Sequence, residues 1–457
     1  MPLTSLFPRR LAAFLFPLLA LLALAPAPAG GAVVVRDTEI ERYLRDLARP
    51  VLEAAGLAPD GVEIVILRDP AINAFVAGGR RLFVHTGLLA ATETPEQLAG
   101  VLAHEAGHMA GGHLVRLADE VRRAAVRSLL GAVLGAAAAA AGAPEVGTAL
   151  VLGGQDVARR EFLSFTRTQE SLADQAAATA LERAGIDPGA LVRFLVVMRR
   201  HEAAMGAGGD VYLRTHPLTD ERIARLRQRV ERSPARGRRL SGAMHRRHAR
   251  MRAKLEGFLA RDPSTVIARR CAGADFADAY ACAIALFRAG RTGEAFARIE
   301  ALLADRPDDP YLHELLGQFR FESGDLAGAE APWRRAVDLV PDAPLLRLGL
   351  ARVLVERGGR ARLEEARRHL AVAVRGDPDA APAHRLLGVV LGRLGETAAS
   401  YVELAEWALR RGRLDDVALY LERAEAAGAG GELALRLADL RAELERARSE
   451  AKRRRRR

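Results

Sequence analysis

The sequence predicts an α+β domain that is mostly helical with a small sheet, followed by an all-α superhelix. Two patterns predict this order. Short β-branched runs alternate with amphipathic helical segments up to about residue 260, and a repeat of 34 residues begins beyond residue 275. The composition agrees, since half of the 457 residues are hydrophobic and only 5% are aromatic. These values exclude a disordered or a collagen-like chain.

The first 32 residues have the order of a secretory signal peptide. Arg9 and Arg10 precede fifteen uncharged residues, which are followed by small residues and prolines up to Ala32. The uncharged stretch contains Pro17 and is shorter than the roughly 20 residues that span a bilayer. We therefore expect a cleaved signal, with an uncleaved anchor as the alternative, and a location in the periplasm of a Gram-negative bacterium.

The segments that follow predict the small sheet and its helices. Val62–Leu67 and Arg81–His85 are typical of strands, and Gly78 with Gly79 predicts a tight turn before the second strand. Apolar periodicity and stop signals predict two helices, Gln97–Leu117 and Glu170–Ala184.

Residues 128–144 form an uncharged stretch, mostly Ala and Gly, between Arg127 and Glu145. The stretch is too short and too weakly apolar for a spanning helix, so we expect a packed helical hairpin. A lid or contact with a membrane surface is the alternative.

The 34-residue period is carried by prolines and glycines. Pro307 and Pro341 are 34 residues apart, as are Gly290 and Gly324. This register is that of tetratricopeptide repeats, in which helix pairs stack into a superhelix with a concave groove that binds protein segments. We count three clear units and a degenerate fourth at about 397–427. The predicted parts of the chain are a signal peptide (1–32), an α+β domain (33–260), a linker (261–275), a repeat domain (276–447) and a basic tail (448–457).

The formal net charge of +11 suggests a nucleic-acid binder, but the charge is local. Two arginines belong to the signal peptide, six basic residues form the run 452–457, and eight lie in a cluster at 236–254 that has few aromatic residues. We expect these runs to give solubility or a disordered end, with attraction to anionic envelope surfaces or acidic proteins as the alternative. No nucleic-acid partner is predicted.

A candidate metal-binding motif lies in the first predicted helix. His104, Glu105 and His108 form the pattern H-E-x-x-H, which places both imidazoles on one helix face with the glutamate beside them. A match of this length also arises by chance, but apolar helix-forming residues precede it, and Gly107 leaves space next to a metal.

A catalytic zinc site needs three protein ligands and an open fourth position. Glu170 and Asp174 share one face of the second predicted helix. Glu170 is the candidate third ligand, and Asp174 is the candidate that orients a ligating histidine through its far ring nitrogen. The alternative is a solvated helix face paired with Arg167.

Further motifs carry a resemblance that covers nearly the whole chain. They are Asn73-Ala74-Phe75, Arg167-x-x-Glu170-x-x-Ala173-Asp174, and Thr215-His216-Pro217 before Arg222-Ile223. With H-E-x-x-H and the repeats, the chain resembles the peptidase family that includes the CAAX prenyl proteases and bacterial membrane-quality-control proteases. Within that family it is similar to the periplasmic branch with C-terminal tetratricopeptide repeats. The resemblance implies a minimal zincin-type metallopeptidase domain.

The resemblance also implies the roles of the site residues. It implies one Zn²⁺ per chain, held by His104, His108 and Glu170. It gives Glu105 the role of catalytic base and Asp174 that of proton donor.

One further residue has a role by resemblance alone. His216 is implied to bind the zinc as a fourth ligand that closes the site, or to assist the transition state when displaced. The alternative is a helix-entry residue before Pro217. Ala177 departs from the glycine that relatives often carry, but it touches no ligand.

Three other features bear on substrate binding and stability. Arg81–His85 is expected to present a strand edge to which an extended peptide adds. His85 and His113 are expected to be structural or surface residues.

Cys271 and Cys282 would lie roughly 16 Å apart on one helix, too far to bridge, but a turn at 273–275 would bring them together, so a disulfide and two buried thiols both remain open.

Together these inferences predict a periplasmic zinc metalloendopeptidase that acts on misfolded or misassembled envelope and outer-membrane proteins. The repeats would dock substrate or the outer-membrane assembly machinery, and peripheral membrane contact is a further expectation. The alternative function is a chaperone or scaffold for outer-membrane protein assembly, latched by His216, that rarely cuts.

Overall fold

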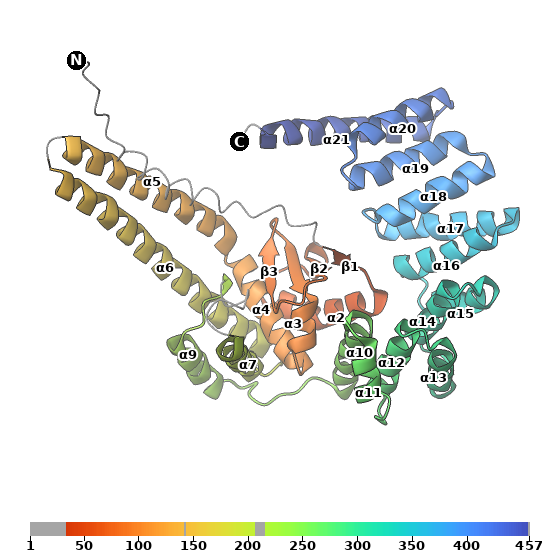
Figure 1. Ribbon diagram of the computed structural model, residues 1–457, viewed down its shortest axis with the longest axis horizontal. Helices are drawn as coiled ribbons and strands as arrows, with labels where there is room; N and C mark the ends of the chain where they lie inside the picture. The colour runs from red at the N-terminus through yellow and green to blue at the C-terminus, as the bar shows by residue number, and fades with distance from the viewer. Residues whose placement is uncertain (1–32, 141–142, 206–214, 456–457) are drawn as a thin grey trace, which may run out of the picture.

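The computed structural model describes residues 33–140, 143–205 and 215–455. The predicted signal peptide, 1–32, lies outside the described residues. A mostly helical domain with one small sheet is followed by a curved array of helices, as predicted (Figure 1). The helices of the first domain are α2 (Thr38–Ala54), α3 (Thr86–Ala91), α4 (Pro95–Ala110), α5 (His113–Ala140), α6 (Pro144–Arg183), α7 (Gly189–Met205), α9 (Asp220–Glu231) and α10 (Gly242–Leu259), with a 3₁₀ turn at Pro59–Gly61.

The sheet has four strands: β1 (Val34–Val35), β2 (Glu63–Leu67), β3 (Ala74–Ala77) and β4 (Arg81–His85). Their order is β1-β2-β4-β3, with β2 and β4 parallel and the other pairs antiparallel. The predicted turn between β3 and β4 is confirmed, because Gly78 and Gly79 have φ values of 61° and 90°, which favour glycine. The expectation that β4 presents an edge is wrong, since β3 covers it. Strand β3 was hard to predict, because its four residues include two alanines of low strand propensity.

The two predicted helices of this domain have different bounds in the structure. The helix expected over 97–117 ends at Ala110, because Gly112 has a φ of 63° and interrupts it before α5 begins. The helix expected over 170–184 is the last part of α6. Its predicted stop is confirmed, since Gly185 has a φ of 71° directly after the helix end.

The core of the first domain surrounds α4. Leu98, Val101 and Leu102 of α4 are buried against Leu44 of α2 and Leu191 of α7, among other side chains of the same cluster. Helix α4 starts with Pro95, and the Thr94 hydroxyl caps it by accepting from the amide of Gln97. Burial of nearly the whole helix fixes its orientation, and therefore that of the H-E-x-x-H motif.

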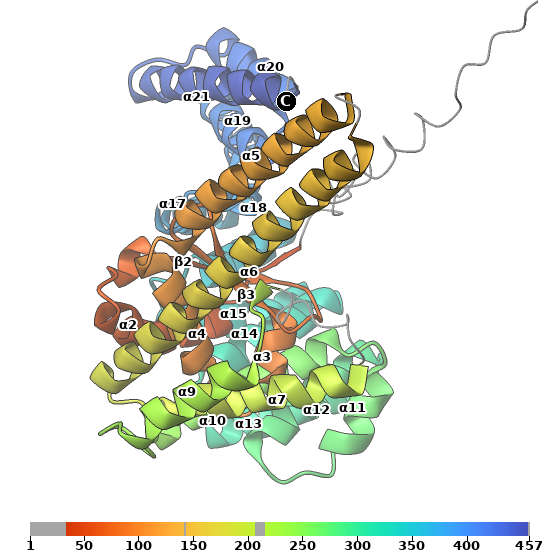
Figure 2. The same cartoon turned by 90° about the vertical axis from the view of Figure 1, so that its left-hand side faces the viewer.

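Helices α5 and α6 form a hairpin that projects from the domain (Figures 1 and 2). The predicted hairpin at 128–144 is therefore present, but it is longer than the uncharged stretch. Among the described residues, one helical segment is long and apolar enough to cross a membrane by length and composition, Val115–Ala140 of α5. The expectation that the stretch is too short is corrected on length, because helix α5 begins at His113, well before Ser128, although this earlier part also carries charged residues.

The array contains helix pairs over its whole described length. Its helices are α12 (Phe276–Arg288), α13 (Thr292–Asp305), α14 (Pro310–Glu322), α15 (Leu326–Leu339), α16 (Pro344–Arg357), α17 (Arg360–Gly376), α18 (Ala381–Leu394), α19 (Thr397–Arg410), α20 (Leu414–Ala426) and α21 (Glu432–Arg455). Small residues stand where helices cross. A Cβ at Gly317 or Gly349 would lie 2.7 Å or less from the ring of Trp333, so both glycines make room for it.

Two segments predicted to lack structure are helical. The predicted linker 261–275 contains α11 (Pro263–Arg270), which is capped by Asp262 and buries Val266. The basic tail predicted at 448–457 continues α21 to Arg455, since Ala, Glu, Lys and Arg are strong helix formers.

Cys271 and Cys282 form a disulfide, with their Cα atoms 5.0 Å apart. Cys271 ends α11 and Cys282 lies in α12, so the turn between the two helices brings them together. Of the two alternatives left open by the sequence, the structure shows the bridge.

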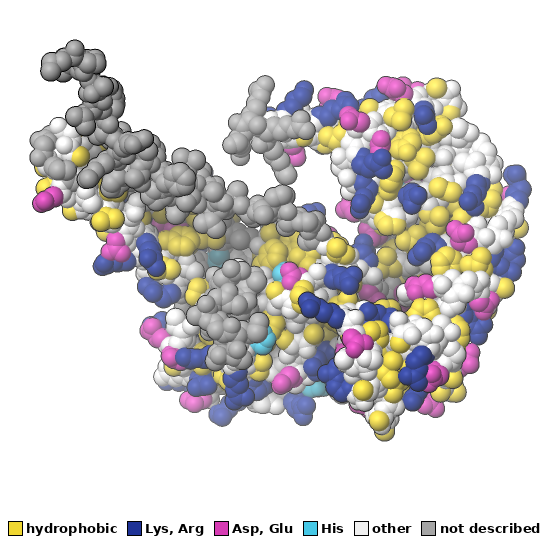
Figure 3. Space-filling model, in the orientation of Figure 1, with side chains coloured by type: hydrophobic (Ala, Val, Ile, Leu, Met, Phe, Trp, Pro, Cys, Tyr) yellow, Lys and Arg dark blue, Asp and Glu magenta, His cyan; other side chains and the backbone are white. Residues whose placement is uncertain are grey.

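The first domain and the array meet in a buried cluster of charges around Lys254 of α10. Its ammonium group lies 2.6 Å from Asp37, 3.2 Å from Glu39 and 3.7 Å from Glu314 of α14. Arg250, one turn earlier, pairs with Glu39 and with Asp309. The basic cluster 236–254 is therefore not all surface charge, since these two members are buried. On the face shown in Figure 3, Lys and Arg side chains are scattered rather than gathered into one patch.

Candidate metal centre

The site forms where α4 crosses α6. A Cβ at Gly107 would lie 2.9 Å from the carbonyl oxygen of Ala173, so only glycine allows the two backbones to approach this closely. The space predicted beside a metal is thus filled by α6. The close approach brings His104 and His108 of α4 next to Glu170 of α6.

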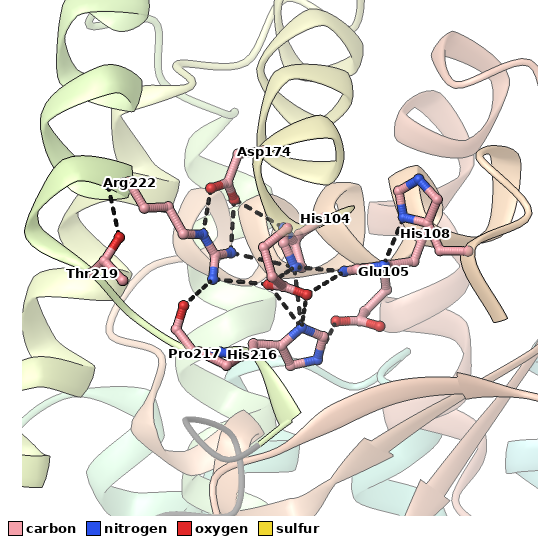
Figure 4. A network of polar contacts seen from close by, with 10 residues as sticks. His104, Glu105, His108, Asp174, His216, Pro217, Thr219 and Arg222 are labelled. Carbon is pink, nitrogen blue, oxygen red and sulfur yellow. Dashed lines mark hydrogen bonds and ion pairs between the residues drawn. The ribbon is translucent and has the colours of Figure 1, made fainter. Parts of the chain in front are cut away.

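Four side chains offer donor atoms that all lie within 4.8 Å of one another: His104, His108, Glu170 and His216. The Nε2 atoms of His104 and His108 are 3.0 Å apart, and each lies 3.2–3.3 Å from a Glu170 oxygen. The Nδ1 atom of His216 lies 3.3 Å from His104 Nε2 and 3.2 Å from Glu170 (Figure 4).

These separations fit a single zinc ion. Four ligands bound tetrahedrally at 2.0–2.1 Å are about 3.3 Å from one another. The donor types also fit, because imidazole nitrogens and a carboxylate oxygen are zinc ligands. The Nδ1 atom of His216 lies close to the other three donors, a position that sequence spacing alone did not assign.

Glu105 lies beside the cluster without belonging to it. Its carboxylate oxygen is 3.4 Å from His216 Nε2, and the side chain is 1% exposed. Burial raises the pKa of Glu105 above its usual range, although the neighbouring His216 and His104 oppose the shift. A carboxylate with a raised pKa accepts a proton more readily, which general-base catalysis requires.

Asp174 contacts the far side of His104. One carboxylate oxygen lies 3.0 Å from His104 Nδ1, and Arg222 donates a 2.9 Å hydrogen bond to the same oxygen. Burial acts to raise the pKa of Asp174, but the hydrogen bonds of Arg222 and His104 outweigh it and lower the pKa. The contacts fit the orienting role predicted from the spacing.

The protonation of the histidines differs across the cluster. Burial acts to lower the pKa of His104, but its hydrogen bonds to Asp174 and Glu170 raise it to about 9. Burial lowers the pKa of His108 to about 4. The pKa of Glu170 is lowered, because hydrogen bonds from three histidines outweigh its burial. The carboxylate charge therefore stays in the site, where it would balance a bound cation.

Arg222 of α9 is a site residue to which the sequence analysis gave no role. The Thr219 hydroxyl caps α9 by accepting from the Arg222 amide, and the guanidinium lies 2.8 Å from Glu170 and 3.5 Å from His104 Nε2. It also donates to the carbonyl of Pro217, which follows His216. Arg222 therefore joins α6 to the His216 segment. Its place six residues after His216, in a motif already noted, was the available signal.

The two histidines expected to be structural differ in their surroundings. His85 is 6% exposed, lies 3.6 Å from Asp69 and is not part of the cluster. His113, equally buried, has its Nδ1 atom 2.9 Å from His108 Nδ1. A Cβ at Gly111 would lie 2.3 Å from the His113 ring, so the glycine makes room for it. His113 thus holds the ring nitrogen of His108 that faces away from the cluster.

Replacing His113 by Ala is expected to weaken zinc binding by about 10- to 100-fold, the usual effect of losing a partner that orients a metal-binding histidine. Titration of the purified chain with a chelating dye measures it. His85→Ala removes a histidine of the same exposure away from the cluster and should bind zinc as the wild type does. Equal affinity of His113→Ala and wild type would contradict the positioning role.

The chain is similar in sequence to a family of peptidases, and part of it is similar to a solved structure. Residues 35–230 match the family model described as peptidase family M48. The β-barrel assembly-enhancing protease of Yersinia pestis is 26% identical over 71% of this chain and 67% of its own length. Its counterpart in Escherichia coli K12 is 30% identical, but over 44% of this chain and 41% of its own length. The solved structure of MamA is 17% identical over 36% of this chain and 97% of its own, with a TM-score of 0.31.

Proposed function

Because residues 35–230 form a domain of peptidase family M48, a family of metallopeptidases, we propose that this chain is a zinc metalloendopeptidase. The sequence resemblance to that family is confirmed. The branch with C-terminal tetratricopeptide repeats is the BepA-like one, and this resemblance is confirmed too, since BepA is the β-barrel assembly-enhancing protease. The zinc, the peptide-bond specificity and the residue roles below are part of the proposal.

The observation that supports the proposal best is the convergence of the donor atoms of His104, His108 and Glu170 within 4.8 Å of one another, with Glu105 buried beside them. These three residues would hold the metal. The chemistry that bound zinc supplies is Lewis acidity, which polarises a carbonyl and acidifies water. Glu105 would take a proton from the attacking water and return it to the leaving amine. Asp174 would keep His104 oriented through Nδ1.

The substrate would bind as an extended strand. Since β3 rather than β4 forms the sheet edge next to α4, we assign peptide binding to Ala74–Ala77. Main-chain hydrogen bonds at a strand edge recognise a peptide with little dependence on its sequence. Such recognition suits unfolded or misassembled proteins, which expose extended chain.

The location and substrates of the chain follow the relatives by analogy. Their name states a role in β-barrel assembly, and this chain spans about two thirds of the first relative and two fifths of the second. We propose that it acts in the periplasm on misfolded or misassembled outer-membrane proteins. The repeat array would dock these substrates or the assembly machinery, because stacked helix pairs form concave protein-binding surfaces.

The position of His216 favours a second candidate function. With Nδ1 close to the other three donors of the cluster, His216 would occupy the place that attacking water needs. A chain that stays in this state would bind client proteins as a chaperone or scaffold and rarely cut them.

One experiment separates the two functions. The purified full chain is incubated with an unfolded outer-membrane β-barrel protein, with and without a zinc chelator, while bound metal is measured by mass spectrometry. We expect chelator-sensitive cleavage that added zinc restores. His216→Ala should raise the rate by about tenfold or more if the latch is mostly closed, since the rate scales with the fraction of open sites.

Two outcomes would contradict these expectations. If wild type and His216→Ala both hold one zinc ion per chain and neither cleaves, the peptidase proposal fails. If His216→Ala cleaves no faster than wild type, the latch is absent. The control is Arg227→Ala, which replaces an exposed residue on α9 and should cleave at the wild-type rate.

A further inference from the structure

The distal halves of α5 and α6 extend beyond the folded body. Both views show the two helices side by side and projecting from the domain (Figures 1 and 2). The described residues of this part, 128–140 and 143–155, are called the distal hairpin below. Most of their side chains are exposed or half-buried, so the distal hairpin is held mainly by the contact between its own two helices.

The exposed surface of the distal hairpin is unusually apolar. Leucine and valine side chains on both helices are between 40% and 64% exposed. They are Leu129, Leu130, Val133, Leu134, Val146, Leu150 and Leu152. Monomeric soluble proteins rarely expose so many large apolar side chains together, and such patches mark a partner or a membrane.

Charge is almost absent from the same surface. Glu145 is the one ionisable residue within 128–140 and 143–155. A protein partner surface usually contains a polar rim and hydrogen-bonding groups. Aliphatic side chains with alanine and glycine between them offer few such groups, which favours a hydrocarbon partner.

A basic collar surrounds the base of the distal hairpin. Residues 113–127 and 156–167 contain seven arginines and four acidic residues. Arg122, Arg123 and Arg160 are 76%, 65% and 78% exposed, so their guanidinium groups are accessible to solvent even where they pair with a neighbouring carboxylate. Arginines that flank the apolar part of a hairpin can pair with the anionic headgroups of a bilayer.

The contact between the two helices is of a kind that is stable in lipid. A Cβ at Gly147 would lie 2.4 Å from the carbonyl oxygen of Gly135, and one at Gly135 would lie 2.6 Å from that of Gly147. The backbones therefore touch at paired glycines. Close packing of small residues holds helices together where no hydrophobic effect acts between them.

The length of the apolar part fits one leaflet. Ser128–Ala140 extends about 20 Å at 1.5 Å per residue, compared with about 15 Å for half of a bilayer core. The preceding part of α5 contains six charged residues between Arg116 and Arg127, which would not enter hydrocarbon. A hairpin also enters and leaves on the same side, so it does not span the membrane.

We propose that the distal hairpin inserts into one leaflet of a bilayer that contains anionic lipids, with the basic collar at the headgroups. The first domain would then be held at the membrane surface by the segment that separates His108 from Glu170. The inference does not depend on peptidase activity.

Vesicle flotation tests this proposal directly. The full chain is mixed with vesicles of phosphatidylethanolamine and phosphatidylglycerol, and the bound fraction is compared with that of a variant carrying Leu129→Gln, Leu130→Gln, Val133→Gln and Leu134→Gln. We expect this variant to bind at least about tenfold more weakly. Gln retains helix propensity. The matched control is Leu419→Gln with Leu435→Gln, which removes two exposed leucines of the array and should bind as the wild type does.

A second measurement locates the inserted part. A tryptophan introduced by Leu130→Trp should shift its emission to the blue and be quenched by lipids brominated on their acyl chains, beyond the signal of the native Trp333 and Trp407. Vesicles of zwitterionic lipid alone should bind the chain more weakly than anionic ones, and the difference should shrink at high salt.

Three outcomes would overturn the proposal. They are equal flotation of wild type and the glutamine variant, no quenching of the introduced tryptophan, and a lipid-free dimer of the wild type that the same substitutions dissociate. The last result would assign the patch to a second copy of the chain. Circular dichroism confirms that the variants remain folded.

Discussion

Replacing Glu105 by Gln is expected to reduce peptide hydrolysis by about two to four orders of magnitude, the usual contribution of a general base. Gln has the same shape but accepts no proton from water at neutral pH. Glu105 is not one of the four clustered donors, so the zinc content should stay at the wild-type level. Cleavage of an unfolded protein, followed together with metal analysis, measures both quantities.

The control for this prediction is Glu231→Gln, the same chemical change at an exposed position at the end of α9. It should cleave as fast as the wild type. If Glu105→Gln retains full activity with zinc bound, Glu105 is not the base. If it loses its zinc as well, the substitution has disturbed the cluster and the rate says nothing about proton transfer.

Replacing Lys254 by Met is expected to lower the free energy of unfolding by about 3–5 kcal/mol, because it leaves buried carboxylates without their cation. Lys254 is 4% exposed and contacts Asp37, Glu39 and Glu314. Burial acts to lower its pKa, but the attraction of these acids raises the pKa well above its usual value, so the charge persists. Urea unfolding followed by circular dichroism measures the loss.

The loss should depend on pH in a defined direction. Burial raises the pKa of Glu314 to about 7, above that of an unfolded glutamate. The folded state then binds more protons than the unfolded state, so this group stabilises less as the pH rises toward 7. Without Lys254, the free energy of unfolding should fall more steeply as the pH rises. The stability of the variant should therefore be closest to that of the wild type near pH 5. The control is Lys452→Met, which replaces the one other lysine of the chain. Lys452 is exposed, so this substitution should leave the free energy of unfolding unchanged. An equal loss in both variants would exclude the buried cluster as the cause.

The sequence was most informative where a single helix carries the chemistry. H-E-x-x-H and the pair Glu170 and Asp174 each lie one turn apart, and α4 and α6 bring them together as the spacing indicated. Helix periodicity fixes which side chains share a face, so such patterns survive without knowledge of the fold. The repeats were recognised for the same reason, because each helix pair repeats its own glycine and proline positions.

Features that depend on contacts between distant segments were not predicted. Arg222 joins α9 to α6 through Glu170 and Asp174, and its partners lie about fifty residues away in the chain. The wrong edge strand has a similar origin, since β3 was too short and alanine-rich to indicate its pairing with β4. The role of His113 also required the structure, because the break at Gly112 turns α5 back so that His113 reaches His108.

Helix α6 is unbroken, so it fixes the distance between the apolar part of the hairpin and the metal cluster. One rigid helix runs from Pro144, in the apolar part of the hairpin, to Glu170 and Asp174 at the metal cluster. Between Gln155, where the apolar part ends, and Glu170 the helix rises about 22 Å. With the apolar end seated in a leaflet and the helix upright, that rise sets the height at which peptide bonds are cut above the lipid. Proteins held deeper, or already folded into the bilayer, would be out of reach, while chain emerging at that height would be exposed to cleavage.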